Sequence, residues 1–144
     1  MQIDETDRAL LALLQENARL PVATLARRLG LARTTVQARL DRLETSGVIQ
    51  GYAVRLADSL RAPLRATVLV SIEPRTAPTV LARLKSLPQV QRVHTTSGRW
   101  DLIVTVEAAT TEGLDDTLDS IGEAKGVRSS ESLIHLTTKM DRGR

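Results

Sequence analysis

Hydrophobic residues in the first fifty positions recur every three or four residues, which is the spacing of amphipathic helices. Acidic residues open the first of these segments, and Asp4 with Asp7 three positions later matches an acidic capping box. Ile3, Leu10, Leu11 and Leu14 would then form the apolar side of that helix. The pattern predicts three helices, over about Asp4–Asn17, Val22–Leu29 and Arg33–Ser46.

The second and third predicted helices form the arrangement typical of a helix-turn-helix. They are joined by a tight turn at Gly30–Leu31, and Gly47 supplies the left-handed residue that often follows a helix end. Val36, Leu40 and Leu43 recur at i, i+4 and i+7, so this face of the third helix should pack inward. The second helix of such a motif enters the major groove of duplex DNA. The polar and basic residues left outward are the candidate DNA-binding residues: Arg27, Arg28, Arg33, Thr34, Thr35, Gln37, Arg39 and Arg42.

From Arg65 onward the pattern changes to short β-branched segments alternating with helices. The resulting order βαββαβ is the split βαβ, or ferredoxin-like, sandwich. Many alternate residues on its open sheet face are apolar, and we expect a second copy to cover that face, giving a homodimer. The predicted elements are strands at Ala66–Ile72, Val90–Thr96, Leu102–Val106 and Val127–Thr138, with helices at Ala77–Leu87 and from Thr110 or Thr111 to Ile121 or Glu123.

These patterns predict an α+β protein with two domains. Residues 1–50 would be a three-helix, winged-type helix-turn-helix domain, and residues 65–144 the βαββαβ domain. Residues 51–64 would link them, because the segment Asp58–Pro63 breaks every regular pattern. Val48–Ile49 and Tyr52–Leu56 fit either a short strand pair or an extended linker.

Charge is distributed unevenly along the chain. The 144 residues carry 20 Lys and Arg against 17 Asp and Glu, a formal net charge of +3. Between Arg19 and Arg42 there are six arginines and one acid, Asp41, whereas the remaining 14 basic residues face 16 acidic ones. Such a local basic cluster is typical either of a nucleic-acid-binding surface or of a solvated helix face, and its place in a helix-turn-helix favours DNA.

Several classes of function lack the residues they need. There is no cysteine, and His94 and His135 lie on different predicted strands without a nearby cluster of acids at metal-ligand spacing. We therefore expect no metal, no cofactor, no catalytic residue and no enzyme activity. The first twenty residues lack a basic region followed by an apolar core, and no apolar run reaches the ~18 residues of a membrane span, so we expect no membrane association. The expected location is the cytoplasm, in association with the nucleoid.

With both domains in place, the chain resembles the leucine-responsive/asparagine regulator (Lrp/AsnC, or feast/famine) family of transcription factors. The resemblance rests on IDETDRALLALLQENAR, LARRLGLARTTVQARLDRLETSGVIQGY, SGRWDL and SSESLIHLTT, which together span nearly the whole chain. It implies a dimer that assembles to an octamer, with an effector, commonly an amino acid, bound between dimers. The effector-binding residues it implies are Thr95, Thr96, Ser97, Gly98, Arg99, Trp100, Asp101, Ile134 and His135.

This chain departs from the family pattern at three of its residues. Arg99 replaces a common acidic or polar residue, Trp100 replaces Tyr or Phe, and Ala32 replaces a Ser or Thr helix cap. Arg99 could bind an effector carboxylate or bridge two subunits, and Trp100 could anchor an oligomer interface or fill a gap beside the turn.

The function that follows is a sequence-specific transcriptional regulator whose assembly and DNA binding respond to a small molecule. One alternative is an architectural protein that wraps double-stranded DNA without an effector. A second alternative is an enzyme that resembles siroheme decarboxylases. Their Arg-Arg-Phe-Gly stretch is absent here, where Ile49–Leu56 is IQGYAVRL.

Overall fold

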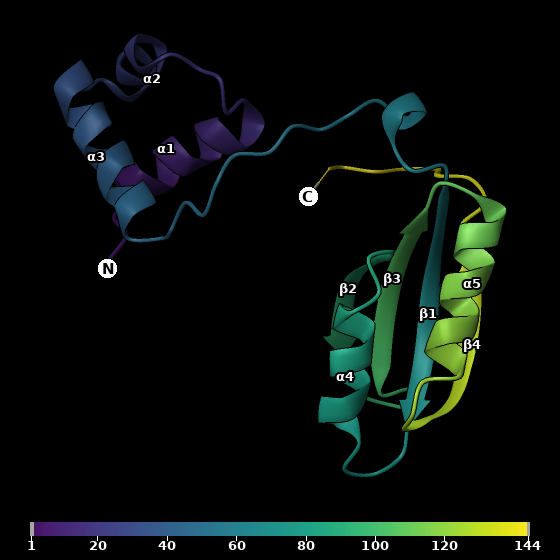
Figure 1. Cartoon of the computed structure of the whole chain (residues 1–144). Helices are drawn as coiled ribbons and strands as arrows, with labels where there is room; N and C mark the ends of the chain where they lie inside the picture. Colours follow the sequence, from purple (N-terminus) through teal and green to yellow (C-terminus); the bar gives the residue numbers. More distant parts are fainter. Residues whose placement is uncertain (1, 144) are drawn as a thin grey trace. The chain divides into compact units, whose positions relative to one another are not determined.

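The computed structural model describes residues 2–143, which divide into two compact units, one ending at Val54 and the other beginning at Arg55 (Figure 1). Each unit has its own hydrophobic core. The first unit is helical and the second combines a sheet with two helices, which confirms the predicted α+β class.

Three helices make up the first unit: α1 (Glu5–Glu16), α2 (Val22–Leu29) and α3 (Arg33–Thr45). Their bounds agree with the predicted ones to within a residue or two. The capping box is present, because the Asp4 side chain accepts from the backbone N–H of Asp7 and the Asp7 side chain accepts from that of Asp4. The fully buried residues of the core come from all three helices: Leu10, Leu25, Val36 and Leu43.

The segment after α3 contains no strand among the residues described, so the extended-linker alternative is the one observed. Gly47 has a φ of +79°, as expected of a residue that ends a helix. The Tyr52 hydroxyl donates to Glu44 Oε1 at 2.8 Å and fixes the start of the linker on α3. A short 3₁₀ turn, η1 (Asp58–Leu60), precedes the second unit.

The second unit has the predicted βαββαβ order. Its antiparallel sheet has the strand order β2-β3-β1-β4, and α4 and α5 lie on the same face of it (Figure 1). This topology confirms the ferredoxin-like sandwich. Its elements are β1 (Leu64–Ile72), α4 (Ala77–Lys85), β2 (Val90–Thr95), β3 (Leu102–Ala108), α5 (Thr111–Gly122) and β4 (Val127–Ile134).

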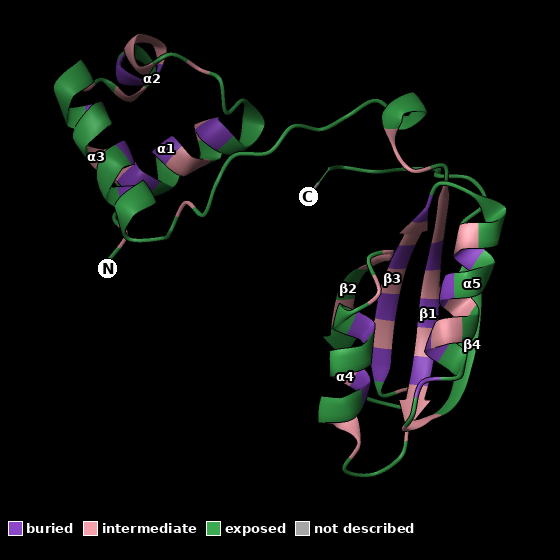
Figure 2. Cartoon of the chain, in the orientation of Figure 1, coloured by how far each residue is buried: buried purple, intermediate pink, exposed green. Residues whose placement is uncertain are grey.

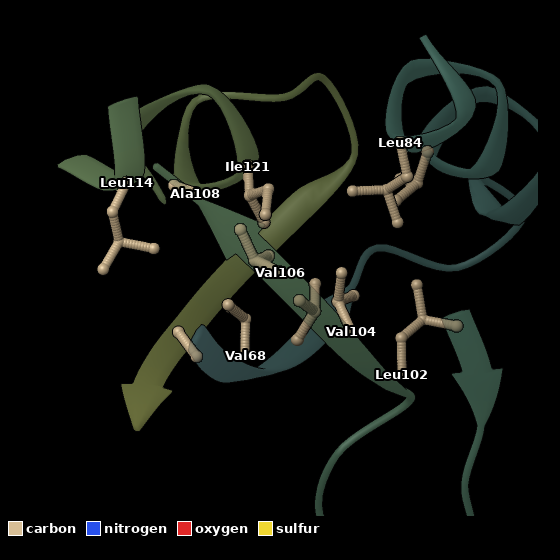
Figure 3. Close-up of a cluster of buried hydrophobic side chains, with 11 residues drawn as sticks. Val68, Leu84, Leu102, Val104, Val106, Ala108, Leu114 and Ile121 are labelled. Carbon is tan, nitrogen blue, oxygen red and sulfur yellow. The ribbon is translucent and has the colours of Figure 1, made fainter. Parts of the chain in front are cut away.

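Alternation of buried and intermediate side chains along β1 and β3 builds the core of this unit. Figure 2 shows both strands banded in buried and intermediate residues, because successive side chains point to opposite faces. The buried set meets Leu84 of α4 and the apolar side of α5 (Figure 3). Its strand members include Val68, Val70, Val104 and Val106, all fully buried.

The opposite face of the sheet carries no helix and is more polar than the sequence suggested. The register places Leu69 opposite Ile103, and Leu133 of β4 opposite Thr67. The expected apolar character holds only for this band of Leu69, Ile103 and Leu133. The other residues of this face on β1 and β3 are Arg65, Thr67, Ser71, Thr105 and Glu107.

Two predicted elements of the second unit end two or more residues earlier than expected. The prediction that the last strand reaches Thr138 is wrong, since β4 ends at Ile134 and pairs with Ala66 of β1. Continuing the ladder would bring Thr137 opposite Pro63, which has no N–H to donate. Helix α4 ends at Lys85 rather than Leu87, because Pro88 disfavours helical backbone in the residue before it.

No helix of residues 2–143 combines the length and apolar character that a membrane span requires.

Candidate nucleic-acid interface and effector turn

The turn between α2 and α3 is built on a left-handed glycine. Gly30 has a φ of +65°, and its N–H, with that of Leu31, caps the carbonyls that end α2. Nothing lies within 4 Å of the place a Gly30 Cβ would occupy, so the backbone conformation alone favours glycine here. The turn allows α3 to begin shortly after α2 ends, as a helix-turn-helix requires.

The first turn of α3 presents polar side chains away from the core. Val36, Leu40 and Leu43 are buried, which leaves Arg33, Thr34, Thr35 and Gln37 exposed. Within the described chain, the side chains of the first three make no hydrogen bond or ion pair, whereas Gln37 Nε2 donates to Asp41 Oδ1 at 2.8 Å. Ala32 provides no side-chain cap, so the N–H groups at this helix end stay open to an anion.

Two further arginines of the candidate set lie in the last turn of α2. Arg27 and Arg28 are exposed, and neither is within ion-pair distance of a carboxylate in the part of the chain that the structure describes. With Arg33 they supply three guanidinium groups available to phosphate, and guanidinium forks match phosphate oxygens well.

Arg39 and Arg42 are engaged inside the domain instead. Arg39 Nη1 donates to both carboxylate oxygens of Asp4, at 2.9 and 2.7 Å, and to Asp7 Oδ1 at 2.9 Å. Arg42 Nη2 donates to Asp7 Oδ2 at 2.9 Å. The Asp7 side chain is fully buried, and each of its two carboxylate oxygens accepts a hydrogen bond from an arginine of α3. These four residues, here called the α1–α3 ion cluster, fasten the start of α1 to the middle of α3.

The ion cluster perturbs the groups within it. The hydrogen bond from Arg39, and then the one from the Asp7 backbone, lower the pKa of Asp4 below its ordinary 3.8. The same contacts to Asp4 and Asp7 raise the pKa of Arg39. Sequence reasoning recognised Asp4 and Asp7 only as capping residues. The missed signal is that Asp7 lies on the same helical side of α1 as Leu10 and Leu14, where a buried charge must have a partner.

The turn between β2 and β3 is tied to β1 by Asp101. Its Oδ2 accepts from the Ile72 N–H at 2.8 Å, and its own N–H donates to the Val70 carbonyl at 2.9 Å. Thr96 closes the turn by donating from its hydroxyl to the Trp100 carbonyl at 2.6 Å. Gly98, with a φ of +97°, makes the tight bend. One Asp101 oxygen, Oδ1, is left without a partner among residues 2–143.

Two side chains extend from this turn. The Arg99 guanidinium carbon lies 5.4 Å from the centre of the Trp100 ring, within range of a cation–π contact. Arg99 and Ser97 are exposed, and Trp100 is half-buried. The turn therefore presents a cation, a backbone bend and a free carboxylate oxygen within five consecutive residues.

The structure does not bring Ile134 and His135 to this turn within one chain. Ile134 pairs with Ala66, whereas Asp101 binds the Val70 carbonyl four residues further along β1, a separation of about 13 Å at the usual strand rise. His135 Nε2 instead forms a 2.8 Å hydrogen bond with the Thr67 hydroxyl. The nine predicted effector residues thus form two groups at opposite ends of the sheet, Thr95 to Asp101 and Ile134 with His135.

Comparison with known proteins matches both units to described families. Residues 3–44 match the AsnC-type helix-turn-helix domain, and residues 65–144 match the Lrp/AsnC ligand binding domain. An uncharacterized HTH-type transcriptional regulator of Pyrococcus horikoshii is 32% identical over 141 residues, which cover 94% of this chain and 94% of the relative.

Solved structures show the same likeness over almost the full length. The structure of E. coli AsnC has a TM-score of 0.88 at 26% identity, covering 99% of this chain and 97% of that one. A transcriptional regulator of Neisseria meningitidis, solved as a complex with L-Met, has a TM-score of 0.86 at 26% identity, covering 97% of this chain and 94% of that one.

Proposed function

Because the chain belongs to the Lrp/AsnC family of transcriptional regulators, we propose that it binds specific duplex DNA through α3 and that an amino acid controls this binding. The family's transcriptional regulators support our expectation that this chain acts as a regulator and not as an enzyme. Its domains are then residues 1–50 for DNA, residues 51–64 as linker, and residues 65–144 for effector binding and oligomerisation. A protein with this role acts in the cytoplasm, on the nucleoid.

The observation that carries the DNA-binding proposal is the exposed first turn of α3. Arg33, Thr34 and Thr35 are exposed on the side away from the buried stripe, at the end of the helix that enters the major groove in this motif. We assign base-edge contacts to Arg33, Thr34, Thr35 and Gln37. Arg27 and Arg28 bind phosphates. Arg39 and Arg42 serve α3 indirectly, through the ion cluster.

Duplexes selected from a random pool by the wild-type protein would test the role of Arg33. If Arg33 contacts a base, Arg33→Ala costs about 1–3 kcal/mol of binding free energy and relaxes the preference at one position of the selected site. Arg83→Ala, at an exposed position of α4, is the matched control and should change neither the binding free energy nor the sequence preference. A loss of the same size on selected and random duplexes would exclude base contact by Arg33.

The amino-acid proposal is supported by the turn Ser97–Asp101 and by the neighbour solved with L-Met. Asp101 Oδ1 is free to accept from an α-ammonium group, and Arg99 and the backbone near Gly98 can bind a carboxylate. Since Ile134 and His135 lie about 13 Å along β1 from this turn, we assign the two halves of the site to different copies of the chain. The effector would therefore bind between dimers of an octamer.

Effector control works only if the ligand binds one assembly state better than another. Thermal shift of the protein with each of the twenty amino acids, followed by light scattering on any hit, measures both binding and assembly. An amino acid that raises the melting temperature and also changes the mass of the assembly supports the proposal. If no amino acid does so and the protein is a large oligomer that binds DNA, the architectural alternative is favoured.

Asp101→Asn tests the site within that assay. The amide oxygen of Asn can still accept from Ile72 N–H, so the turn is kept while the charge is removed. We expect Asp101→Asn to abolish the effector response and to leave DNA binding without effector unchanged. Asp119→Asn, an exposed acid of α5, is the control. An unchanged response in Asp101→Asn would place the ammonium elsewhere.

A further inference from the structure

The sheet face that carries no helix has groups of opposite character along its two edges, β2 and β4 (Figure 1). Arg92 and His94 of β2 lie on this face, since Val93 between them packs on the core. Glu131 of β4 lies on it as well, because it pairs with Leu69. Arg92, His94 and Glu131 are exposed, and none forms a hydrogen bond or ion pair with another of residues 2–143. A cation and an imidazole therefore mark one edge and a carboxylate marks the other.

The strand register arranges the residues of this face in rows that cross all four strands. In the central row the two middle residues are apolar and the two edge residues are polar, so a hydrophobic strip has unpaired groups at both of its ends. The neighbouring row begins with Arg92 and ends with Leu133. The central row is His94, Ile103, Leu69 and Glu131, from β2 through β3 and β1 to β4.

A second copy can cover this face in two symmetric ways, because the two-fold axis between stacked sheets lies either across the strands or along them. An axis across the strands places β2 over β2 and β4 over β4, so each edge meets groups of its own charge. An axis along the strands places β2 of each copy over β4 of the other. Only the second arrangement brings opposite charges together, and like charges in contact across an interface are costly.

We propose that two copies stack these faces about a two-fold axis along the strands, with Arg92 and His94 of each copy against Glu131 of the second copy. Every row then covers the same row of the second copy, so Ile103 packs on Leu69. Aligned sheets rotate by about 30° relative to one another, which moves an edge strand by about 4 Å, roughly half the spacing of two rows. Glu131 therefore lies within reach of both Arg92 and His94.

This arrangement has consequences for the proposed function, although the stacking itself does not rest on it. Both copies of β1 begin at the same end of the stacked sheets, so both linkers leave from that end, as two domains on neighbouring half-sites require. Because rows cover equal rows, Asp101 of one copy stays at the opposite end from His135 of the second copy. The two halves of the proposed effector site then meet only between dimers.

Cross-linking of the full chain through single introduced thiols tests the axis. The sequence has no cysteine, so His94→Cys and Glu131→Cys each carry one thiol. Stacked sheets lie about 10 Å apart, too far for a disulfide but within the span of a short bismaleimide. We expect covalent dimers when the two variants are co-expressed. His94→Cys alone should give none, because its two thiols would lie about 17 Å apart.

The control is Arg83→Cys co-expressed with Glu131→Cys, since Arg83 lies on α4, on the other face of the sheet, and it should give no covalent dimer. Cross-linking of His94→Cys to itself would overturn the proposal in favour of the axis across the strands. Absence of covalent dimers from the co-expressed pair would overturn it as well. The DNA-binding proposal is unaffected by any of these results, because no DNA is present.

Exchanging the charges of the two edges tests the ion pairs themselves. Glu131→Lys should raise the dimer dissociation constant, measured by sedimentation equilibrium, about tenfold for each of the two symmetric contacts, or about a hundredfold in total. Adding Arg92→Glu and His94→Glu to it should restore the wild-type value to within about threefold. Asp119→Lys, an equal charge change on exposed α5, should leave the constant unchanged. A triple variant as weak as Glu131→Lys would exclude contact between the two edges.

Discussion

Asp7→Asn tests whether the α1–α3 ion cluster holds the DNA-binding domain together. The substitution keeps the shape of a fully buried side chain but removes the charge that Arg39 and Arg42 share. Breaking a buried ion pair by removing one partner costs about 3–5 kcal/mol. The two arginine side chains are 24% and 50% exposed and can regain water, so we expect about 2–4 kcal/mol in the free energy of unfolding.

A loss of this size is large for the domain. A unit of about fifty residues has roughly 3–8 kcal/mol of stability, so the substitution should remove about half of it. Urea unfolding followed by far-UV circular dichroism would detect the change, because the first unit is helical. Trp100 fluorescence reports only on the second unit and should give an unchanged midpoint.

Asp41→Asn is the matched control, an exposed acid of α3 whose carboxylate accepts, among residues 2–143, only from Gln37, and it should cost less than about 0.5 kcal/mol. An Asp7→Asn effect as small as that of Asp41→Asn would refute the reasoning.

The same cluster predicts the salt dependence of DNA binding. Arg28→Gln should reduce the slope of log K against log salt by about 0.9, whereas Arg39→Gln should leave the slope unchanged even if binding weakens.

Two further predictions concern pH and packing. Since hydrogen bonds from Arg39 lower the pKa of Asp4 in the folded state, its contribution to stability is complete above the unfolded value of 3.8 and is lost as the pH falls below it. The urea midpoint of the helical unit should therefore decline below about pH 4, and less steeply in Asp4→Asn. Gly126→Ala should destabilise the second unit by about 2–4 kcal/mol, because its Cβ would lie 2.7 Å from Thr76 Cβ at a φ of +97°. Trp100 fluorescence in urea would measure this, and Gly122→Ala, whose Cβ lies 3.5 Å from its nearest neighbour, should be close to neutral.

The order of elements was predictable because it rests on local signals. The helix ends at Asp4, Gly30 and Gly47 follow from capping and left-handed backbone, and the alternation in β3 follows from one buried face. The end of β4 was missed because it depends on where its partner strand begins: β1 starts at Leu64, about seventy residues earlier in sequence, and Ile134 already pairs with Ala66. The hydrophobic pattern of one segment does not show which backbone groups its partner strand offers for hydrogen bonding.

The candidate sites were predictable to a lesser degree. The exposed first turn of α3 followed from its helical stripe, but the pairing of Arg39 and Arg42 with α1 depended on how two distant segments meet. Charge counted along the chain does not distinguish a guanidinium that is already bound from one that is free.

The engagement of Arg39 and Arg42 inside the domain limits how strongly one copy can hold DNA. If Arg27 and Arg28 each neutralise one phosphate, binding by a single domain falls with a salt slope of only about −1.8. A monomer with so few contacts would dissociate readily at physiological ionic strength. If several copies assemble as proposed, tight occupancy comes from avidity, because a second domain on the same assembly meets its half-site at a high effective concentration. Under the proposed assembly, the internal ion cluster would make occupancy of DNA steeply dependent on how many copies are joined.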